Sequence, residues 1–278
     1  EAESAMRRSL DIYERNLGPE HADVADALTN LTEIFLTQER YQDAEPFMQR
    51  ALTIREKTSA ADAPELAPAL INMAAIHKGQ RHFDQSRDLY QRAVEILEKA
   101  EGSDNPDLGP ALTDLALCDR AMGNIDQAAT TVRRVLGLYE KTIGPGHPAF
   151  AKTLTYLAEI YTAKGFLPAA EPFLNQALEI FEKSLPKNHP EIAETLDKVA
   201  MVHLSKNEPD KAEPLMQRAL KIYVEALGAD HPVVAQAKNN LAEYYLGKKR
   251  YDKAKPLFEE SLQTRRNVLG ETHPAVAQ

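Results

Sequence analysis

The sequence contains a single cysteine, Cys118, among its 278 residues, so a disulfide within the chain is impossible. One free thiol fits a reducing compartment, and we expect a cytoplasmic protein. No apolar run approaches the roughly 18 residues that a membrane span requires, and no signal peptide opens the chain. We therefore expect no membrane partner.

Basic residues are fewer than acidic ones. The chain has 33 Lys and Arg against 42 Asp and Glu, a formal net charge of -9. An acidic surface disfavours nonspecific binding to DNA, RNA and anionic membranes, because all three attract cationic proteins. We expect no nucleic-acid partner, since the longest basic run, Lys248–Arg250, falls at a predicted turn.

Sequence motifs of enzymes are missing. Neither G-x-x-x-x-G-K nor G-x-G-x-x-G occurs, and the zinc motif H-E-x-x-H does not occur either. Cys118 shares its position in a repeat, described next, with aliphatic residues, which favours a small buried hydrophobe. His77 and His203 share a position with Phe35 and Tyr161, which predicts half-buried packing. We expect no enzyme activity, no catalytic residue, no cofactor and no metal.

The sequence does contain one pattern that returns every 42 residues without insertion or deletion. Its clearest marks are a glycine and a His-Pro pair: Gly18, Gly102, Gly144, Gly228 and Gly270, and His147-Pro148, His189-Pro190, His231-Pro232 and His273-Pro274. A fixed period of about 20 to 50 residues is typical of stacked repeat arrays. Such arrays have one continuous core and present a long surface that normally binds a partner.

The period divides the chain into units of a single array spanning residues 1–278. A partial unit at 1–16, which supplies a lone second helix, comes first, and a partial unit at 269–278 comes last. The complete units between them are 17–58, 59–100, 101–142, 143–184, 185–226 and 227–268. Because both ends fall inside a unit, we expect a fragment of a longer protein.

Each unit has the pattern of a helical hairpin. In the unit 143–184, apolar residues recur at spacings of three and four, first over 149–163 and then over 168–183. Pro148 suits a first helical turn, where a missing N–H costs nothing. Alanines at matching positions of the second helices allow neighbouring helices to approach at the short end of about 8–10 Å. The fold class is therefore all-α.

Residues within the unit resemble a known family. The runs Leu157-Ala158-x-x-Tyr161 and Ala170-x-x-x-Leu174-x-x-Ala177 match the tetratricopeptide repeat, whose usual unit has about 34 residues. The longer unit, its Leu-Gly-x-x-His-Pro link and the run Asn239–Ala242 resemble the kinesin-light-chain subtype. The resemblance implies a right-handed α-solenoid superhelix of tandem hairpins. It also implies a noncatalytic interaction module or scaffold, in which the first helices line a concave groove that binds a protein or peptide.

By this resemblance, the groove is lined by exposed columns of the first helices. We expect peptide contacts from Thr29, Asn30, Glu33, Asn72, Lys78, Thr113, Asp114, Arg120, Thr155, Tyr156, Lys198, Asn239 and Asn240. Asn, Thr and Tyr offer donors and acceptors that suit the backbone of an extended peptide or a partner helix.

Charges in the groove are expected to set its specificity. Lys78, Arg120 and Lys198 would take acidic side chains, whereas Asp197 and its neighbours form an acidic spot towards the C-terminal end. Kinesin-light-chain arrays bind acidic, tryptophan-containing peptides in a basic groove. Because the signs are mixed here, we do not expect that class of ligand.

A column of histidines invites a metal-binding hypothesis. It consists of His21, His147, His189, His231 and His273. Equivalent positions of neighbouring units lie well over about 10 Å apart, since helices pack at about 8–10 Å, whereas zinc needs nitrogens at about 2.0–2.1 Å. We expect these residues to order the link before each first helix.

Two other functions stay open. The chain is the sensory or regulatory arm of a larger signalling ATPase or protease, or it is a self-assembling scaffold. The second alternative would follow if the repeat ends expose core positions such as Leu10, Ile12 and Val276, which could pair between chains as a homo-oligomer.

The unit 101–142 departs most from the shared pattern. Asp119 and Thr131 replace hydrophobic residues, and Gly109 and Gly137 lie in predicted helices. Glycine inside a helix costs about 0.5–1 kcal/mol relative to alanine. We expect this hairpin to be the least stable part of the array.

Overall fold

The structure, a computed structural model, describes residues 2–269, and over these residues it contains thirteen α-helices and one short 3-10 helix. In chain order they are α1 (Ala2–Leu17), α2 (Ala22–Thr37), α3 (Tyr41–Thr58), the 3-10 helix (Pro64–Leu66), α4 (Ala67–Gly79), α5 (Phe83–Glu101), α6 (Leu108–Ala121), α7 (Ile125–Thr142), α8 (Pro148–Ala163), α9 (Leu167–Ser184), α10 (Pro190–Ser205), α11 (Pro209–Leu227), α12 (Pro232–Gly247) and α13 (Tyr251–Leu269). The hairpin expected at 149–163 and 168–183 is α8 and α9, displaced by one residue at most ends.

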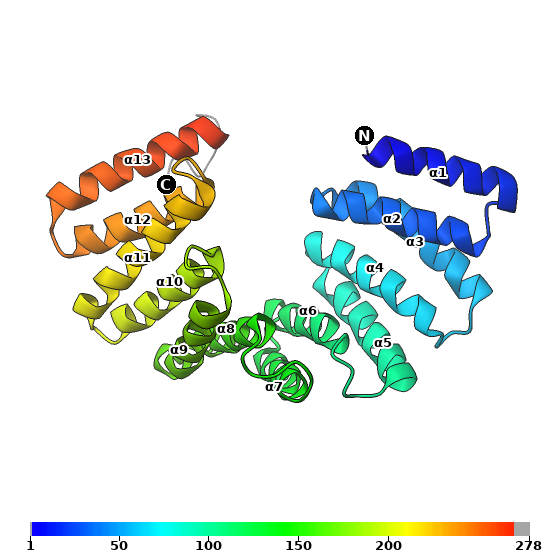
Figure 1. The fold of residues 1–278 in the computed structure, drawn as a ribbon, viewed down its shortest axis with the longest axis horizontal. Coiled ribbons are helices and arrows are strands. Elements are labelled where there is room, and N and C mark those ends of the chain that lie inside the picture. Colours follow the sequence, from blue (N-terminus) through cyan, green and yellow to red (C-terminus); the bar gives the residue numbers. More distant parts are fainter. Residues whose placement is uncertain (1, 270–278) are drawn as a thin grey trace. The chain divides into compact units, whose positions relative to one another are not determined.

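The helices form two compact units, Glu1–Gly144 and Pro145–Gln278, which are described separately. In the first unit α1 packs on α2, and the hairpins α2–α3, α4–α5 and α6–α7 follow (Figure 1). The second helix of a hairpin also packs on the first helix of the next, as α3 does on α4 and α5 on α6. The second unit repeats this order with α8–α9, α10–α11 and α12–α13. The expected all-α solenoid of tandem hairpins is confirmed.

The alanine positions of the second helices are fully enclosed, as close helix packing requires. The residues with no exposed surface at these positions are Ala44, Ala51, Ala93, Ala128, Ala170, Ala177, Ala212 and Ala219. Aromatic rings fill the neighbouring gaps within a hairpin. Phe35 stacks on Phe47 with ring centroids 5.6 Å apart, and Tyr161 stacks on Phe173 at 5.4 Å. In these two hairpins, large aromatic residues therefore fill the space beside the small alanines.

The histidine column caps the first helices. In His21, His147, His189 and His231, the ring Nδ1 accepts a hydrogen bond from the backbone N–H two residues later, at 3.1–3.2 Å. Each cap satisfies one of the free N–H groups at a helix start. The expected role in ordering the link is confirmed for these four residues, whereas His273 lies outside the described residues.

The turn inside each hairpin places one residue in the left-handed region of the backbone. These residues recur every 42 positions, with φ from 56° to 85°: Glu39, Arg81, Gly123, Gly165, Asn207 and Lys249. The next residue donates its N–H to the carbonyl five positions earlier, as in Arg40 to Phe35 at 2.9 Å and Arg250 to Tyr245 at 2.9 Å. This is the Schellman closure of a helix end, and it reverses the chain within three residues.

Helix α1 exposes an apolar position that α3 and α5 bury. Ile12 is 55% exposed, whereas Ile54 and Ile96 at the same position are 3% and 4% exposed. Leu10, expected to be exposed as well, is instead buried at 9% exposure, because its side of α1 packs on α2. Val276 lies outside the described residues.

Across residues 2–269, none of the helices combines the length and the apolar character that crossing a bilayer demands.

Candidate functional site

The predicted groove residues of the first unit lie on α2, α4 and α6. We call their surface the first-helix face of this unit: Thr29, Asn30, Glu33, Asn72, Lys78, Thr113, Asp114 and Arg120. Asn30 is exposed and Asn72 is half-buried. Within residues 2–269, neither side-chain amide forms a hydrogen bond to another residue. The two amides occupy equivalent positions of adjacent hairpins, so both are free to pair with a bound backbone.

The threonines of this face use their hydroxyl protons within their own helices. Thr29 donates to the carbonyl of Ala25 at 2.9 Å, and Thr113 donates to the carbonyl of Gly109 at 2.8 Å. Both side chains are half-buried, while Glu33 is exposed. The threonines can therefore accept a hydrogen bond from a ligand but have no free proton to donate.

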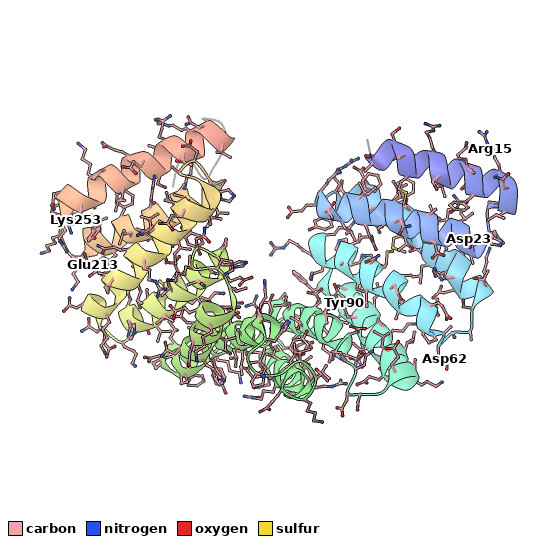
Figure 2. All side chains as sticks on the ribbon, viewed as in Figure 1. Arg15, Asp23, Asp62, Tyr90, Glu213 and Lys253 are labelled. Carbon is pink, nitrogen blue, oxygen red and sulfur yellow. The ribbon has the colours of Figure 1, made fainter. Side chains whose placement is uncertain are left out.

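The cation and the carboxylate expected to contact a ligand are paired with each other. Lys78 Nζ lies 2.5 Å from Asp114 Oδ1, and the hydroxyl of Tyr90 donates to Asp114 Oδ2 at 2.9 Å. Burial, followed by the charge of Asp114, raises the pKa of Tyr90 (labelled on α5 in Figure 2). Arg120, the second expected cation of this unit, is half-buried.

The expected cation of the second unit is also paired. Lys198 on α10 donates to Glu159 at 2.7 Å and to Glu194 at 2.6 Å. Thr155 is only 4% exposed, and its hydroxyl donates to the carbonyl of Lys152 at 2.7 Å. A buried, internally bonded side chain cannot contact a peptide, so Thr155 belongs to the core rather than to the surface.

The remaining predicted residues of the second unit are half-buried. The amide of Asn239 donates to Glu243 at 2.7 Å, and Gln236 donates to the side-chain oxygen of Asn240 at 2.7 Å. Tyr156 is half-buried on α8. Asn240 keeps its own N–H donors for a ligand, in contrast to Asn239.

A hollow of about 730 Å³ is lined by residues of α10, α11 and α12 in the second unit, of which α10 and α12 are first helices. Its lining includes Met201, Leu204, Met216, Tyr244, Asn240 and Glu243. Met201 is 55% exposed and contributes an apolar surface to the hollow. The hollow thus combines an apolar wall with a polar edge, a common composition of ligand sites.

Asp197 lies one helical turn before Met201 on α10. Within residues 2–269, the half-buried carboxylate forms no hydrogen bond or ion pair. Burial, reinforced by the charge of Glu194, raises its pKa to about 7. An unpaired carboxylate in this environment is stabilised by any cation that approaches it.

Lys152 on α8 and Lys198 on α10 are already paired with glutamates. Lys152 donates to Glu191 at 2.5 Å, and this hydrogen bond raises the pKa of Lys152. We call the surface around Asp197 the first-helix face of the second unit: Lys152, Tyr156, Glu159, Glu191, Glu194, Asp197, Lys198, Met201, Asn239, Asn240 and Glu243.

The residues considered for catalysis lie in the packed interior. Cys118 is fully buried, its Sγ is 3.2 Å from the hydroxyl of Ser86, and burial raises the pKa of the thiol. A raised pKa keeps the thiol protonated and therefore a poor nucleophile. His77 and His203 are half-buried, which confirms the packing role expected for them.

Polar ties between successive hairpins were missed by the sequence reasoning. Among the described residues, a second-helix residue bonds to the end of the next first helix, or to the turn after it, in five places: Glu3 to Arg40, Glu45 to Gln80, Arg87 to Asp119, Glu171 to Lys206 and Glu213 to Arg250. Figure 2 shows Glu213 on α11 and Lys253 on α13, whose charged groups are 3.9 Å apart. The recurrence of charge at one position per unit was the signal that could have revealed these ties.

A family model described as Tetratricopeptide repeat matches residues 1–57, 65–141, 149–225, 199–267 and 233–278. The chain is similar to BtubC (BKLC) from P. vanneervenii, with a TM-score of 0.67, 19% identity, and coverage of 90% of this chain and 94% of that chain. No curated protein matches the sequence.

Two further solved structures are similar. A putative kinesin light chain from Podosopora anserina with nearly identical TPR-like repeats has a TM-score of 0.64 and 20% identity, covering 74% of this chain and 98% of that chain. The STAND signal transduction ATPase PH0952 from Pyrococcus horikoshii, which has a tetratricopeptide repeat sensor, has a TM-score of 0.71 and 14% identity, covering 96% and 40%. At these identities the likeness concerns the fold alone. The family model spans most of the chain and the hairpins stack in the order described above, so the chain belongs to the tetratricopeptide repeat family, and its structural relatives include kinesin-light-chain-like members.

Proposed function

We propose that the chain is a noncatalytic protein-interaction module that holds an extended peptide or a partner helix on its first-helix faces. Tetratricopeptide repeats are typically scaffolds for protein–protein interaction. Stacked helical repeats offer long surfaces whose side chains can differ from unit to unit while the core stays the same.

The observation that carries this proposal is the pair of unused amides at Asn30 and Asn72. Each of these amides can both donate to and accept from a peptide backbone. Equivalent positions on adjacent hairpins would hold successive parts of one extended segment. Asn240 occupies the same repeat position in the second unit, and its amide N–H groups remain available although its oxygen accepts from Gln236.

Two of the three cations expected to contact a ligand are paired within the chain. Lys78 is neutralised by Asp114 and Lys198 by two glutamates, so neither is a free anchor for acidic side chains. The substitution Lys78→Glu would also place a second carboxylate beside that of Asp114. Variants of the asparagines therefore test the face more cleanly than variants of the lysines.

Peptides selected from a random dodecapeptide library against the wild-type chain supply the probe. The double variant Asn30→Ala/Asn72→Ala should bind such peptides about tenfold more weakly, since each lost hydrogen bond is worth about 0.5–1.5 kcal/mol. The matched control is Asn16→Ala, an exposed asparagine on α1 outside the face. Fluorescence anisotropy gives the dissociation constants, and circular dichroism checks helicity. Equal affinity of the double variant and the wild type, over all selected peptides, contradicts the proposal.

Self-association is a second candidate, favoured by the apolar surface of α1. Ile12, Tyr13 and Leu17 are 55%, 39% and 43% exposed. Neighbouring apolar side chains of this kind mark interaction surfaces in soluble proteins. Light scattering over a range of concentrations should show a dimer that Ile12→Lys abolishes. A monomer at all concentrations rules this candidate out.

A further inference from the structure

The first-helix face of the second unit has two unsatisfied features on the same helix. Asp197 has a half-buried carboxylate without a partner among residues 2–269, and Met201 is 55% exposed at the wall of the hollow. A desolvated charge gains from contact with a cation, and an apolar side chain gains from contact with another apolar group. A ligand that combines a cation for Asp197 with an apolar side chain for Met201 would satisfy both features.

The net charge of this face is negative. Its carboxylates are Glu159, Glu191, Glu194, Asp197 and Glu243, and its ammonium groups are Lys152 and Lys198, with Lys248 at the edge of the hollow. Lys152 and Lys198 are both held in ion pairs with glutamates of the face. A bound segment therefore meets an excess of negative charge and, at Asp197, a carboxylate with no competing cation. Electrostatic complementarity selects a basic partner here.

The spacing of the two features fits an extended segment. Asp197 and Met201 are four residues apart on α10, which is about 6 Å along a helix axis. Side chains on one side of an extended peptide repeat every second residue, at about 6.6–7 Å. One peptide can thus place a cation at Asp197 and an apolar side chain in the hollow if these two residues are separated by a single residue.

We propose that the second unit binds a basic, partly apolar peptide, in which a Lys or Arg pairs with Asp197 and a large apolar side chain two positions away fills the hollow beside Met201. The proposal rests on the proposed function and adds the chemical class of the partner. Asn240 lies at the edge of the same hollow and offers its amide N–H groups to the peptide backbone. Acidic peptides are excluded by the same charges.

The probes are fluorescein-labelled peptides with a Gly-Ser background around Arg-Ser-Leu or Leu-Ser-Arg. Matched peptides carry Glu in place of Arg, or Ser in place of Leu. The protein variants are Asp197→Asn and Met201→Ser. Their controls are Asp230→Asn, an exposed carboxylate in a link, and Phe166→Ser, an apolar residue 59% exposed in a hairpin turn.

The better of the two Arg/Leu peptides should bind about tenfold more tightly than its Glu counterpart, as expected for a charge-assisted contact. Asp197→Asn should remove the higher affinity for the Arg peptide over the Glu peptide, without changing the gain in affinity that Leu gives over Ser. Met201→Ser should reduce the gain in affinity that Leu gives over Ser, and should leave the gain that Arg gives over Glu unchanged. Each variant removes one of the two contacts. Both controls should bind like the wild type.

Binding that is equal for Arg and Glu peptides, or unchanged in Asp197→Asn, overturns the inference. Absence of binding by every designed peptide overturns it as well. If library-selected peptides then still respond to Asn30→Ala/Asn72→Ala, the proposed function stands and only the partner class is wrong. If the selected peptides do not respond, the proposed function fails independently.

Discussion

Lys78 Nζ lies 2.5 Å from Asp114 Oδ1, so two residues of the first-helix face that were expected to contact a ligand contact each other. They come from the first helices of adjacent hairpins, α4 and α6, 36 residues apart in the chain. Tyr90 from α5 completes the group by donating to the same carboxylate. The pair therefore ties two hairpins together.

We predict a measurable coupling between these two residues. A double-mutant cycle with Lys78→Met and Asp114→Asn should give an interaction free energy of about 0.5–1 kcal/mol in favour of the pair, since both side chains are partly buried. Urea unfolding followed by circular dichroism measures it. The more exposed pair Lys221–Glu225, within α11, is the control and should give a smaller coupling. A coupling no larger than that of the control would contradict the structural role.

The folding stability should depend on pH through Asp197. Burial raises its pKa to about 7 from the ordinary value of 3.8, so the native state holds this proton more tightly than the unfolded state does. Its contribution to stability is complete below about pH 4 and is lost as the pH rises through about 7. Asp197→Asn should therefore raise the melting temperature at about pH 8 and change it little at about pH 4. Asp230→Asn is the control, and equal shifts at both pH values would contradict the account.

Two glycines of the hairpin α6–α7 should respond to alanine with opposite signs. A Cβ at Gly109 would collide with the hydroxyl oxygen of Tyr139, whereas a Cβ at Gly137 meets nothing within 4 Å. Gly137→Ala should stabilise the protein by about 0.5–1 kcal/mol, the usual cost of a glycine inside a helix. Gly109→Ala should destabilise it by about 1–3 kcal/mol through overpacking. Urea unfolding midpoints of the two variants provide the comparison, and the same sign for both would refute this assignment.

The hairpin α6–α7 should exchange its amide hydrogens faster than the hairpin α2–α3. Asp119 is 1% exposed and receives a bond from Arg87 on one oxygen, but its Oδ2 has no partner among residues 2–269. A buried acceptor without a partner costs about 1–3 kcal/mol. Hydrogen exchange with mass spectrometry measures the protection, and residues 109–138 as the best protected region would reverse the expected order.

The sequence was sufficient to predict the fold because every unit repeats the same core. The alanines at Ala44 and Ala170, the cap at His147 and the turn at Gly165 each follow from one position compared across units. Helices and turns are decided by residues close together in the chain, so a short segment is enough to predict them.

Which side chains of the first-helix faces are free to bind a ligand was harder to predict, because this depends on contacts between residues at different positions of the repeat. Lys78 and Asp114 belong to different columns, and a comparison along single columns does not show that they meet. Thr155 was expected at the surface and is buried, since its depth depends on its neighbours rather than on its polarity. The sequence does contain a sign of the hollow beside Met201. At the repeat position of Met201, the preceding unit has Glu159 and the next unit has Glu243, so an apolar side chain replaces a charged one.

The most direct test of the central claim is a photo-crosslinking measurement. A peptide selected against the wild-type chain is prepared with a benzophenone residue, crosslinked, and its sites of attachment are mapped by mass spectrometry. The first-helix faces predict attachment to residues of α2, α4 and α6, or of α8, α10 and α12. Attachment confined to the second helices would contradict the claim that the first helices form the binding surface.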